Sequence, residues 1–267
     1  MRIGVVQMTS TDDLGANLQS ARELVGRAAA GGAEFIALPE NFAYLRREGE
    51  RFPCAQGLDG KIVESLRELA REHRAWILGG SFPEAILGES RVHNTSVLLA
   101  PDGEVVAVYR KLHLFDVDLG GGGGGRFRES EQVAAGDQVV VAPTPFGPLG
   151  LSSCYDLRFP ELYRQMIDRG ARWIAVPSAF APHTGKDHWE PLLRARAIEN
   201  QVFVIAPAQS GRHSPDRSSH GRSLIVDPWG LVLAQAPDGP GVILADCDPG
   251  AQDRIREAIP FLQNRRL

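Results

Sequence analysis

The two halves of the chain repeat one pattern of residues. Residues 32–40 read Gly-Ala-Glu-Phe-Ile-Ala-Leu-Pro-Glu, and residues 170–178 read Gly-Ala-Arg-Trp-Ile-Ala-Val-Pro-Ser. A hairpin signal at 101–103 is echoed at 227–230, and the order and spacing of these segments indicate an internal duplication. Two similar sheets, each covered by helices on one face, bury their bare faces against each other. The repeat therefore predicts an α/β fold, a four-layer α-β-β-α sandwich with an internal pseudo-twofold repeat.

Short apolar runs alternate with amphipathic segments along the chain, as expected for strands that alternate with helices. The expected helices are 14–30, 62–73, 159–169, 188–200 and 251–259. The expected strands are 3–7, 35–38, 76–80, 95–99, 105–109, 139–142, 149–153, 173–176, 202–206, 223–226, 232–235 and 242–245. Since no linker-like change of composition interrupts this order, we expect a single domain over residues 1–267.

Composition excludes several classes of function. A net charge of −4 and a pI near 6 argue against a nucleic-acid or membrane-surface binder. The first residues reach two aspartates before a secretory segment develops, and no run approaches membrane-spanning length, so we expect a cytoplasmic protein. Cys54, Cys154 and Cys247 are odd in number and lack metal-type spacing, which indicates reduced thiols without disulfides or zinc.

Three chemically suited residues follow apolar strands directly. Cys154 lies between a strand and a helix that has Pro160 near its start, Glu40 follows the 35–38 strand, and Lys111 follows the 105–109 strand. Ligands of open α/β sheets gather at the carboxyl ends of strands, so these residues are expected to share one cleft. Free N–H groups at the helix start are expected to lower the thiol pKa and to bind an oxyanion.

Lysine itself is rare in this chain. Among 29 basic residues only Lys61, Lys111 and Lys186 are lysines, so a lysine kept at position 111 indicates a need for a compact ammonium.

With these residues the chain resembles the carbon-nitrogen hydrolase, or nitrilase, superfamily, whose catalytic glutamate, lysine and cysteine occur in this order and in such settings. The resemblance covers nearly the whole chain and extends to the branch that holds the amidases acting on deaminated glutathione and the omega-amidases. The segments that carry it are Tyr109–Asp116, Cys154–Glu161, His188–Glu199, Ala208–His213 and Gly221–Gly230.

The resemblance implies a mechanism of amide hydrolysis that needs no cofactor or metal. Cys154 would attack the carbonyl carbon to give a thioester, and Glu40 would carry the proton. Lys111 and the backbone N–H of Tyr155 would bind the oxyanion. A second family glutamate matches Glu129, which would hold Lys111 and orient the substrate; Glu131 is close enough in sequence to compete for this assignment.

For the substrate, the branch resemblance implies a small amide that bears carboxylates, with deaminated glutathione first and 2-oxoglutarate and cysteinylglycine as products. Omega-amidase action on 2-oxoglutaramate, another aliphatic amidase or carbamoylase activity and nitrile hydrolysis remain alternatives. A homodimer or higher homo-oligomer is expected by resemblance alone. An anionic substrate needs cationic partners. The candidate binding residues are Tyr44, Tyr155, Arg158, His188, Arg194 and Arg212, with His213 nearby.

Other patterns indicate weaker candidates. The glycine run Gly120–Gly125 predicts a mobile segment and not a phosphate-binding loop, because no Lys-Ser/Thr pair follows it; whether it closes over the substrate is left open by the sequence. Ser152 resembles a serine elbow but is expected inside a strand, and His183 and His188 lack a third metal ligand. A non-catalytic binding scaffold is the alternative from another class. A thiol peroxidase lacks an evident resolving cysteine.

Overall fold

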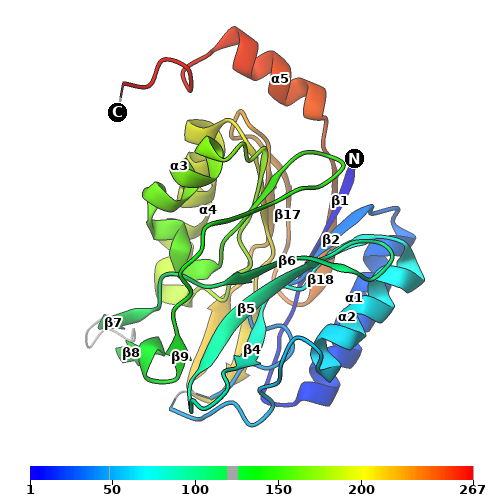
Figure 1. The fold of residues 1–267 in the computed structure, drawn as a ribbon, viewed down its shortest axis with the longest axis vertical. Helices are drawn as coiled ribbons and strands as arrows, with labels where there is room; N and C mark the ends of the chain where they lie inside the picture. The colour runs from blue at the N-terminus through cyan, green and yellow to red at the C-terminus, as the bar shows by residue number, and fades with distance from the viewer. Residues whose placement is uncertain (48, 119–125, 267) are drawn as a thin grey trace.

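The computed structural model describes residues 1–47, 49–118 and 126–266. The segment Gly120–Gly125, for which we expect mobility, lies outside these residues. Figure 1 shows two sheets stacked between helices, α1 and α2 on one side and α3 and α4 on the other. The helices are α1 (Leu14–Ala30), α2 (Lys61–His73), α3 (Pro160–Asp168), α4 (Pro182–Asn200) and α5 (Pro249–Ala258), with short 3-10 helices η1 (Glu129–Glu131) and η2 (Cys154–Arg158).

The first sheet has the order β18-β1-β2-β3-β5-β4, and β6 and β9 also pair with β5. Its strands are β1 (Arg2–Gln7), β2 (Phe35–Ala37), β3 (Trp76–Leu78), β4 (Phe82–Ala85), β5 (Val92–Leu99), β6 (Val105–Arg110), β9 (Val133–Ala134) and β18 (Gly241–Asp246).

The second sheet has the order β10-β11-β12-β13-β16-β17, and two hairpins, β7-β8 and β14-β15, stand apart from both sheets. The strands are β10 (Val140–Ala142), β11 (Leu149–Leu151), β12 (Trp173–Ala175), β13 (Phe203–Ala206), β16 (Leu224–Val226), β17 (Val232–Gln235), β7 (Asp116–Asp118), β8 (Arg126–Arg128), β14 (Ser210–Ser214) and β15 (Arg217–His220).

The expected duplication is visible in the strand pairing. In each sheet three consecutive parallel strands, β1-β2-β3 and β11-β12-β13, are followed by two antiparallel strands and preceded by an antiparallel edge. Phe35 pairs with Ile3 and Trp76 on its two neighbouring strands, and Trp173 holds the equivalent place in the second sheet. The repeat in the sequence therefore corresponds to a repeat of topology.

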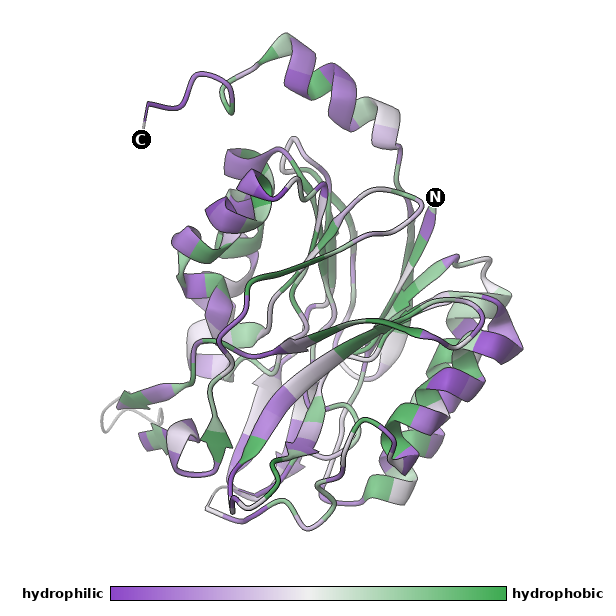
Figure 2. Cartoon of the chain, in the orientation of Figure 1, coloured by the Kyte–Doolittle hydropathy of each residue, from purple (hydrophilic) through white to green (hydrophobic). Residues whose placement is uncertain are grey.

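Alternation along the strands builds the layers. Phe35 and Trp173 belong to the apolar cluster between the two sheets, whereas their neighbours Ile36 and Ile174 join the clusters beneath the helices. Because successive side chains point to opposite faces of a strand, each strand supplies both layers. Figure 2 shows the hydrophobic sides of α1 and α2 turned toward the sheet. The four-layer sandwich expected from the sequence is confirmed.

The expected start of the fourth helix was wrong. We expected it at His188, but α4 begins at Pro182 and continues past Pro191. Pro182 suits the first turn because proline lacks an N–H, and an N–H at this position would have no partner within the helix. The helix start was missed because Gly185 and its polar neighbours show no apolar periodicity. At Gly185 a Cβ would lie 2.4 Å from the Cβ of His220, so this turn packs closely against β15.

The hairpins β7-β8 and β14-β15, with β4 and β9, were not anticipated from the sequence. Helix α5 lies apart from the sandwich in Figure 1 and contacts it through Gln252, whose amide nitrogen donates to the carbonyls of Arg172 and Gln201. In the part of the chain that the structure describes, no helix has the length and apolar character needed to span a bilayer.

Candidate active site

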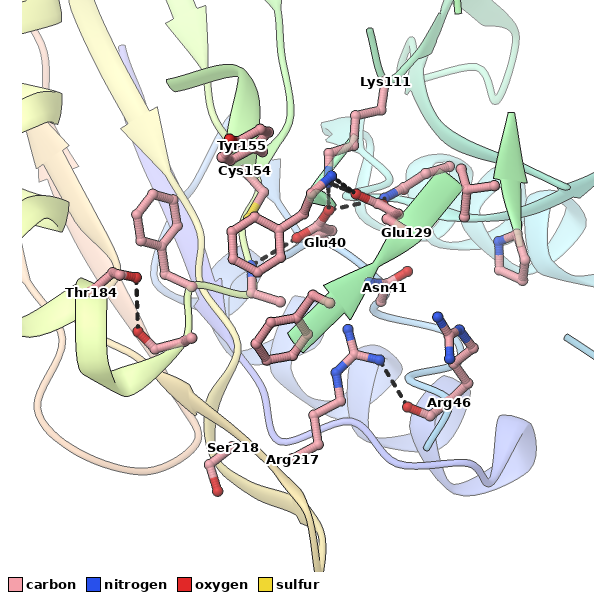
Figure 3. A pocket seen from close by; sticks show the side chains of 18 of the residues that line it. Glu40, Asn41, Arg46, Lys111, Glu129, Cys154, Tyr155, Thr184, Arg217 and Ser218 are labelled. Carbon is pink, nitrogen blue, oxygen red and sulfur yellow. Dashed lines mark hydrogen bonds and ion pairs between the residues drawn. The ribbon is translucent and has the colours of Figure 1, made fainter. Parts of the chain in front are cut away.

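Strand ends place the three predicted catalytic residues together. Glu40 follows β2 after Leu38 and Pro39, Cys154 follows β11, and Lys111 directly follows β6. All three line one cavity of about 370 Å³, within the usual size of small-molecule sites. Figure 3 shows their side chains turned toward one another.

The turn at Cys154 holds the residue in an uncommon backbone conformation. Its φ is 46°, in the left-handed region that residues other than glycine seldom adopt. The N–H of Cys154 donates to the Pro177 carbonyl at 2.9 Å, and Ser153 and Asp156 form a reciprocal capping box around the start of η2. These bonds fix a local geometry that the chain would otherwise avoid, as is common at functional sites.

Glu40 is buried, and both of its carboxylate oxygens accept hydrogen bonds. Oε1 accepts from Lys111 Nζ at 3.0 Å and from Asn94 Nδ2 at 2.9 Å. Ser153 Oγ lies 3.3 Å from the same oxygen, and the N–H of Ala179 donates to Oε2 at 2.9 Å. The carboxylate is therefore held in one orientation beside the cysteine turn.

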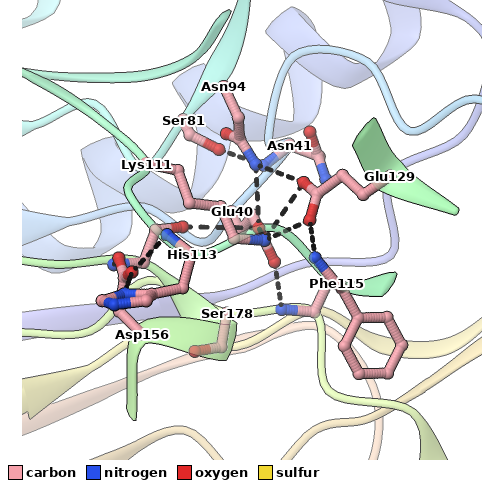
Figure 4. Close-up of polar contacts among 12 residues, drawn as sticks. Glu40, Asn41, Ser81, Asn94, Lys111, His113, Phe115, Glu129, Asp156 and Ser178 are labelled. Carbon is pink, nitrogen blue, oxygen red and sulfur yellow. Dashed lines mark hydrogen bonds and ion pairs between the residues drawn. The ribbon is translucent and has the colours of Figure 1, made fainter. Parts of the chain in front are cut away.

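Lys111 lies between two carboxylates (Figure 4). Besides its bond to Glu40, Nζ donates to Glu129 at 2.9 Å and 3.1 Å. Glu129, on η1, also accepts from the N–H of Phe115 at 2.6 Å, which ties it to the segment that follows Lys111. Because charged donors and acceptors make strong bonds in a buried site, the ammonium is fixed tightly.

Asn94 joins the two glutamates from β5. Its Nδ2 donates to Glu40 at 2.9 Å and approaches Glu129 at 3.4 Å, and its backbone carbonyl accepts from the N–H of Lys111. Its Oδ1 is buried without a hydrogen-bond partner among the described residues. Asn94 could not be recognised from the sequence, because an asparagine inside an apolar strand belongs to no chemical motif.

Burial and charge set the protonation states of the cluster. Burial would raise the pKa of Glu40, but the charge of Lys111 and the hydrogen bonds from Lys111, Cys154 and Asn94 hold it below its ordinary value. Burial alone would lower the pKa of Lys111, yet Glu129 and Glu40 keep it well above its usual range. The site at rest thus holds a carboxylate beside an ammonium.

The thiol pKa differs from our expectation. Burial and the negative charge of Glu40 raise the pKa of Cys154 well above its ordinary value, and the opposing effects of Lys111 and the Ala179 N–H are smaller. Our expectation of a lowered pKa was wrong, because it counted the free N–H groups of the turn and neglected desolvation and the neighbouring carboxylate. Cys154 is therefore a neutral thiol that needs a base.

Asp156 connects the cysteine turn to the lysine segment. Its fully buried carboxylate accepts from the Tyr109 hydroxyl at 2.5 Å, from the Ser153 N–H at 2.8 Å, and from both the backbone N–H and the Nδ1 of His113. The His113 ring stacks on Phe159, with centroids 3.7 Å apart. Residues on both sides of Lys111 are thus bonded to the helical turn that begins at Cys154.

Comparison with known proteins agrees with this geometry. Residues 2–257 match the family model described as carbon-nitrogen hydrolase. A Synechocystis protein named deaminated glutathione amidase is 45% identical over 263 residues, which are 97% of this chain and 96% of that protein. The chain is a member of the carbon-nitrogen hydrolase family. It is accordingly a hydrolase that acts on carbon-nitrogen bonds other than peptide bonds.

Solved structures confirm the fold of this carbon-nitrogen hydrolase. The Caenorhabditis elegans NitFhit protein superposes with a TM-score of 0.93 at 42% identity. The aligned region covers 99% of this chain and 65% of the NitFhit chain. Nit3 of Saccharomyces cerevisiae, a member of branch 10 of the nitrilase superfamily, gives a TM-score of 0.89 at 30% identity, with 100% and 97% of the two chains covered.

The pocket of the hydrolase is lined by apolar side chains and a few charged ones. Tyr155 and Arg158, both predicted from the sequence, line it, and the Arg158 guanidinium lies over the rings of Phe180 and Tyr155. His188 is on α4 outside the lining, with Nδ1 3.3 Å from a guanidinium nitrogen of Arg158. Its contact with the pocket is therefore indirect.

Three other predicted binding residues lie elsewhere. Tyr44 is buried against Phe52 and does not line the pocket. Arg194 donates to the Gly230 carbonyl at the turn after β16, and Arg212 donates to the carbonyls of Ser214 and Pro215. For these three the structure does not support direct contact with the substrate, because their side chains are used in packing or in bracing turns.

His213 is also outside the lining; burial lowers its pKa to about 4, and its Nδ1 bonds to the Ser10 carbonyl. Ser152, expected inside a strand, follows the end of β11 at Leu151. Its buried hydroxyl donates to the Ala175 carbonyl and bonds to the Tyr163 hydroxyl, in agreement with a structural role. Within the described ranges, which omit 48, 119–125 and 267, no group of three or more histidine, cysteine, aspartate or glutamate side chains is placed to hold a metal ion.

Two arginines that the sequence analysis missed line the pocket. Arg46 belongs to the segment between β2 and α2, and Arg217 begins β15. Neither lies near a recognisable motif, and the only sequence signal was the general excess of arginine in this chain.

Proposed function

We propose that this hydrolase cleaves deaminated glutathione to 2-oxoglutarate and cysteinylglycine, with Cys154 as the nucleophile. The observation that carries the proposal is a buried thiol that lines one cavity with the Glu40 carboxylate, which is itself held by the Lys111 ammonium 3.0 Å away. A nucleophile that lies next to a positioned base and oxyanion donors is the arrangement that acyl transfer requires.

In the first half-reaction, Sγ of Cys154 attacks the amide carbon as Glu40 accepts the thiol proton. Lys111 and the N–H of Tyr155 stabilise the tetrahedral oxyanion, a contribution of about 3 kcal/mol per well-placed donor. The C–N bond then breaks, and Glu40 returns its proton to the departing nitrogen. The acyl group remains as a thioester on Cys154.

In the second half-reaction, water replaces the amine. Glu40 accepts a proton from the water as its oxygen attacks the thioester carbon, the C–S bond breaks, and the thiol regains the proton. Glu129 touches no reacting atom in this scheme. It acts as a positioning residue, because its two bonds to Lys111 hold the ammonium where the oxyanion forms.

Two observations support an anionic amide as the substrate. The Synechocystis relative that covers 97% of this chain is named for deaminated glutathione. The pocket also carries Arg46, Arg158 and Arg217 although the whole chain is acidic. Guanidinium groups favour carboxylates because they donate paired hydrogen bonds to them.

The test follows 2-oxoglutarate release from deaminated glutathione and from 2-oxoglutaramate. Wild type is compared with Cys154→Ala, and Cys54→Ala is the matched control because Cys54 lies outside the pocket lining. Preferred turnover of deaminated glutathione that only Cys154→Ala abolishes supports the proposal. Preference for 2-oxoglutaramate changes the assignment to omega-amidase, and turnover that survives Cys154→Ala refutes the mechanism.

We further propose that residues 1–267 form a single domain, that copies of it pair into a homodimer or higher homo-oligomer, and that it works in the cytoplasm. Near-complete coverage of the Synechocystis relative supports the first point, and three unpaired cysteines fit a reducing compartment. Light scattering of the purified protein measures the oligomer, and a monomer at micromolar concentration contradicts the second point.

A further inference from the structure

The pocket carries cations at two separate places. Arg158 is on η2 beside the Cys154 turn, whereas Arg46 and Arg217 lie on the opposite side of the pocket from Cys154, as Figure 3 shows. Beyond the Glu40-Lys111-Glu129 cluster, Asp216 is the acidic residue in the lining that the structure describes. Among the described lining residues, arginines therefore outnumber acidic residues away from the reacting groups.

Arg217 is bonded to the neighbouring wall of the pocket. Its Nη1 donates to the backbone carbonyl of Arg46 at 2.9 Å, so the β14-β15 hairpin is bonded to the segment between β2 and α2. Arg212 braces the turn before Arg217 through the carbonyls of Ser214 and Pro215. The position of Arg217 is thus largely fixed before a ligand binds.

Arg46 supports the same place on the pocket wall. The residue is 5% exposed, and its guanidinium lies 5.3 Å from the centroid of the Phe52 ring. Arg217 bonds to the backbone carbonyl of Arg46, so the two arginines lie next to each other in the pocket lining. Asp216 is exposed and accepts a hydrogen bond from Ser214 Oγ at 2.5 Å. Two neighbouring cations on a partly apolar wall favour an anionic ligand.

We infer that Arg217, with Arg46, forms a second carboxylate subsite, which receives the carboxylate on the leaving-group side of the amide. This inference rests on the proposed function and extends it, because deaminated glutathione has a carboxylate on each side of the scissile bond. Arg158, beside Cys154, then serves the acyl side. A small amide such as 2-oxoglutaramate has an acyl-side carboxylate only and leaves the second subsite unused.

The measured quantity is the ratio of kcat/KM for deaminated glutathione to kcat/KM for 2-oxoglutaramate. Arg217→Gln is expected to lower this ratio about 10- to 100-fold, the effect of losing a charge-assisted bond to a carboxylate. Arg217→Lys keeps the charge but loses the paired donors, so it is expected to fall between wild type and Arg217→Gln. Arg194→Gln, which removes an arginine outside the pocket lining, is the matched control and keeps the wild-type ratio.

Binding to Cys154→Ala provides a second readout that does not depend on turnover. Calorimetry compares deaminated glutathione with the analogue whose terminal carboxylate is replaced by an amide, with and without Arg217→Gln. The inference predicts that Arg217→Gln weakens binding of the acid about 10-fold more than binding of the amide-ended analogue. Equal weakening of both ligands, or an unchanged kcat/KM ratio, overturns it. Absence of turnover in wild type instead refutes the proposed function, while this binding comparison still tests the subsite.

Discussion

Replacement of Lys111 by methionine tests how the buried charges are balanced. Lys111 is 2% exposed and donates to Glu40 at 3.0 Å and to Glu129 at 2.9 Å and 3.1 Å. Methionine has a similar length and no charge, so Lys111→Met leaves two carboxylates facing each other without a cation. Removal of one partner from a buried ion pair costs about 3 to 5 kcal/mol. For a chain of this size that loss lowers Tm by roughly 6 to 20 °C at neutral pH.

The loss of stability in Lys111→Met is expected to depend on pH. In wild type the depressed pKa of Glu40 adds stability above the pKa of the unfolded chain, and this contribution disappears as pH falls through the folded pKa. Without the ammonium, burial and the second carboxylate raise the pKa of Glu40. The folded variant is therefore destabilised at pH values above that raised pKa, and the destabilisation decreases below it. The difference in Tm between the two proteins is therefore larger at pH 8 than at pH 5.

Thermal unfolding of both proteins at pH 8 and pH 5 measures this difference. Lys186→Met is the matched control, since Lys186 is exposed and its nearest carboxylate, on Asp187, is 3.8 Å away at the surface. We expect its Tm to remain near that of wild type at both pH values. A Lys111→Met Tm equal to that of wild type, or a deficit of the same size at pH 5 and pH 8, refutes the charge balance described above.

Two further predictions concern residues around the same cluster. Because the pKa of Glu40 lies below its ordinary 4.5, wild-type kcat/KM is expected to stay constant from pH 8 to about pH 5 and to fall only at lower pH. An acid limb of the pH profile centred near pH 6.5 contradicts this. Glu40→Gln is expected to lower kcat/KM about 100- to 10,000-fold at pH 7.5. Asp156→Asn removes the charge and keeps one of the two acceptor oxygens, of which Oδ2 accepts from Tyr109 and Oδ1 from His113. We expect Tm to fall by roughly 2 to 12 °C together with a loss of kcat. Asp253→Asn, at an exposed ion pair, is expected to change neither, and wild-type kcat in Asp156→Asn contradicts the positioning role.

The layers and the strand ends could be predicted because they depend on local patterns. Apolar runs that end in proline gave β2 and β12 almost to the residue, and the placement of Glu40 after one of them followed directly. The start of α4 could not be predicted in this way. Its first turns carry Gly185 and polar residues, and what stabilises them is the close packing of Gly185 against β15, a contact between segments distant in sequence.

The protonation states of the site residues also could not be predicted from the sequence. The turn around Cys154 was predicted correctly, but the thiol pKa depends on how deeply the sulfur is buried and on where Glu40 lies, which are both tertiary properties. Asn94 was missed as a member of the polar network for the same reason, since it gains its importance from Glu40, which a distant segment supplies.

By itself the sequence determined the duplicated α/β sandwich and the order of the glutamate, lysine and cysteine, because hydrophobic periodicity and the residues that end strands are local properties. Only the tertiary structure decided which arginines line the pocket. Arg212 and Arg217 belong to one hairpin, yet the first braces the turn and the second lines the pocket. Side chains on a strand point to alternating faces, and the face that meets the pocket is set by how the hairpin docks against α4 and the segment around Arg46.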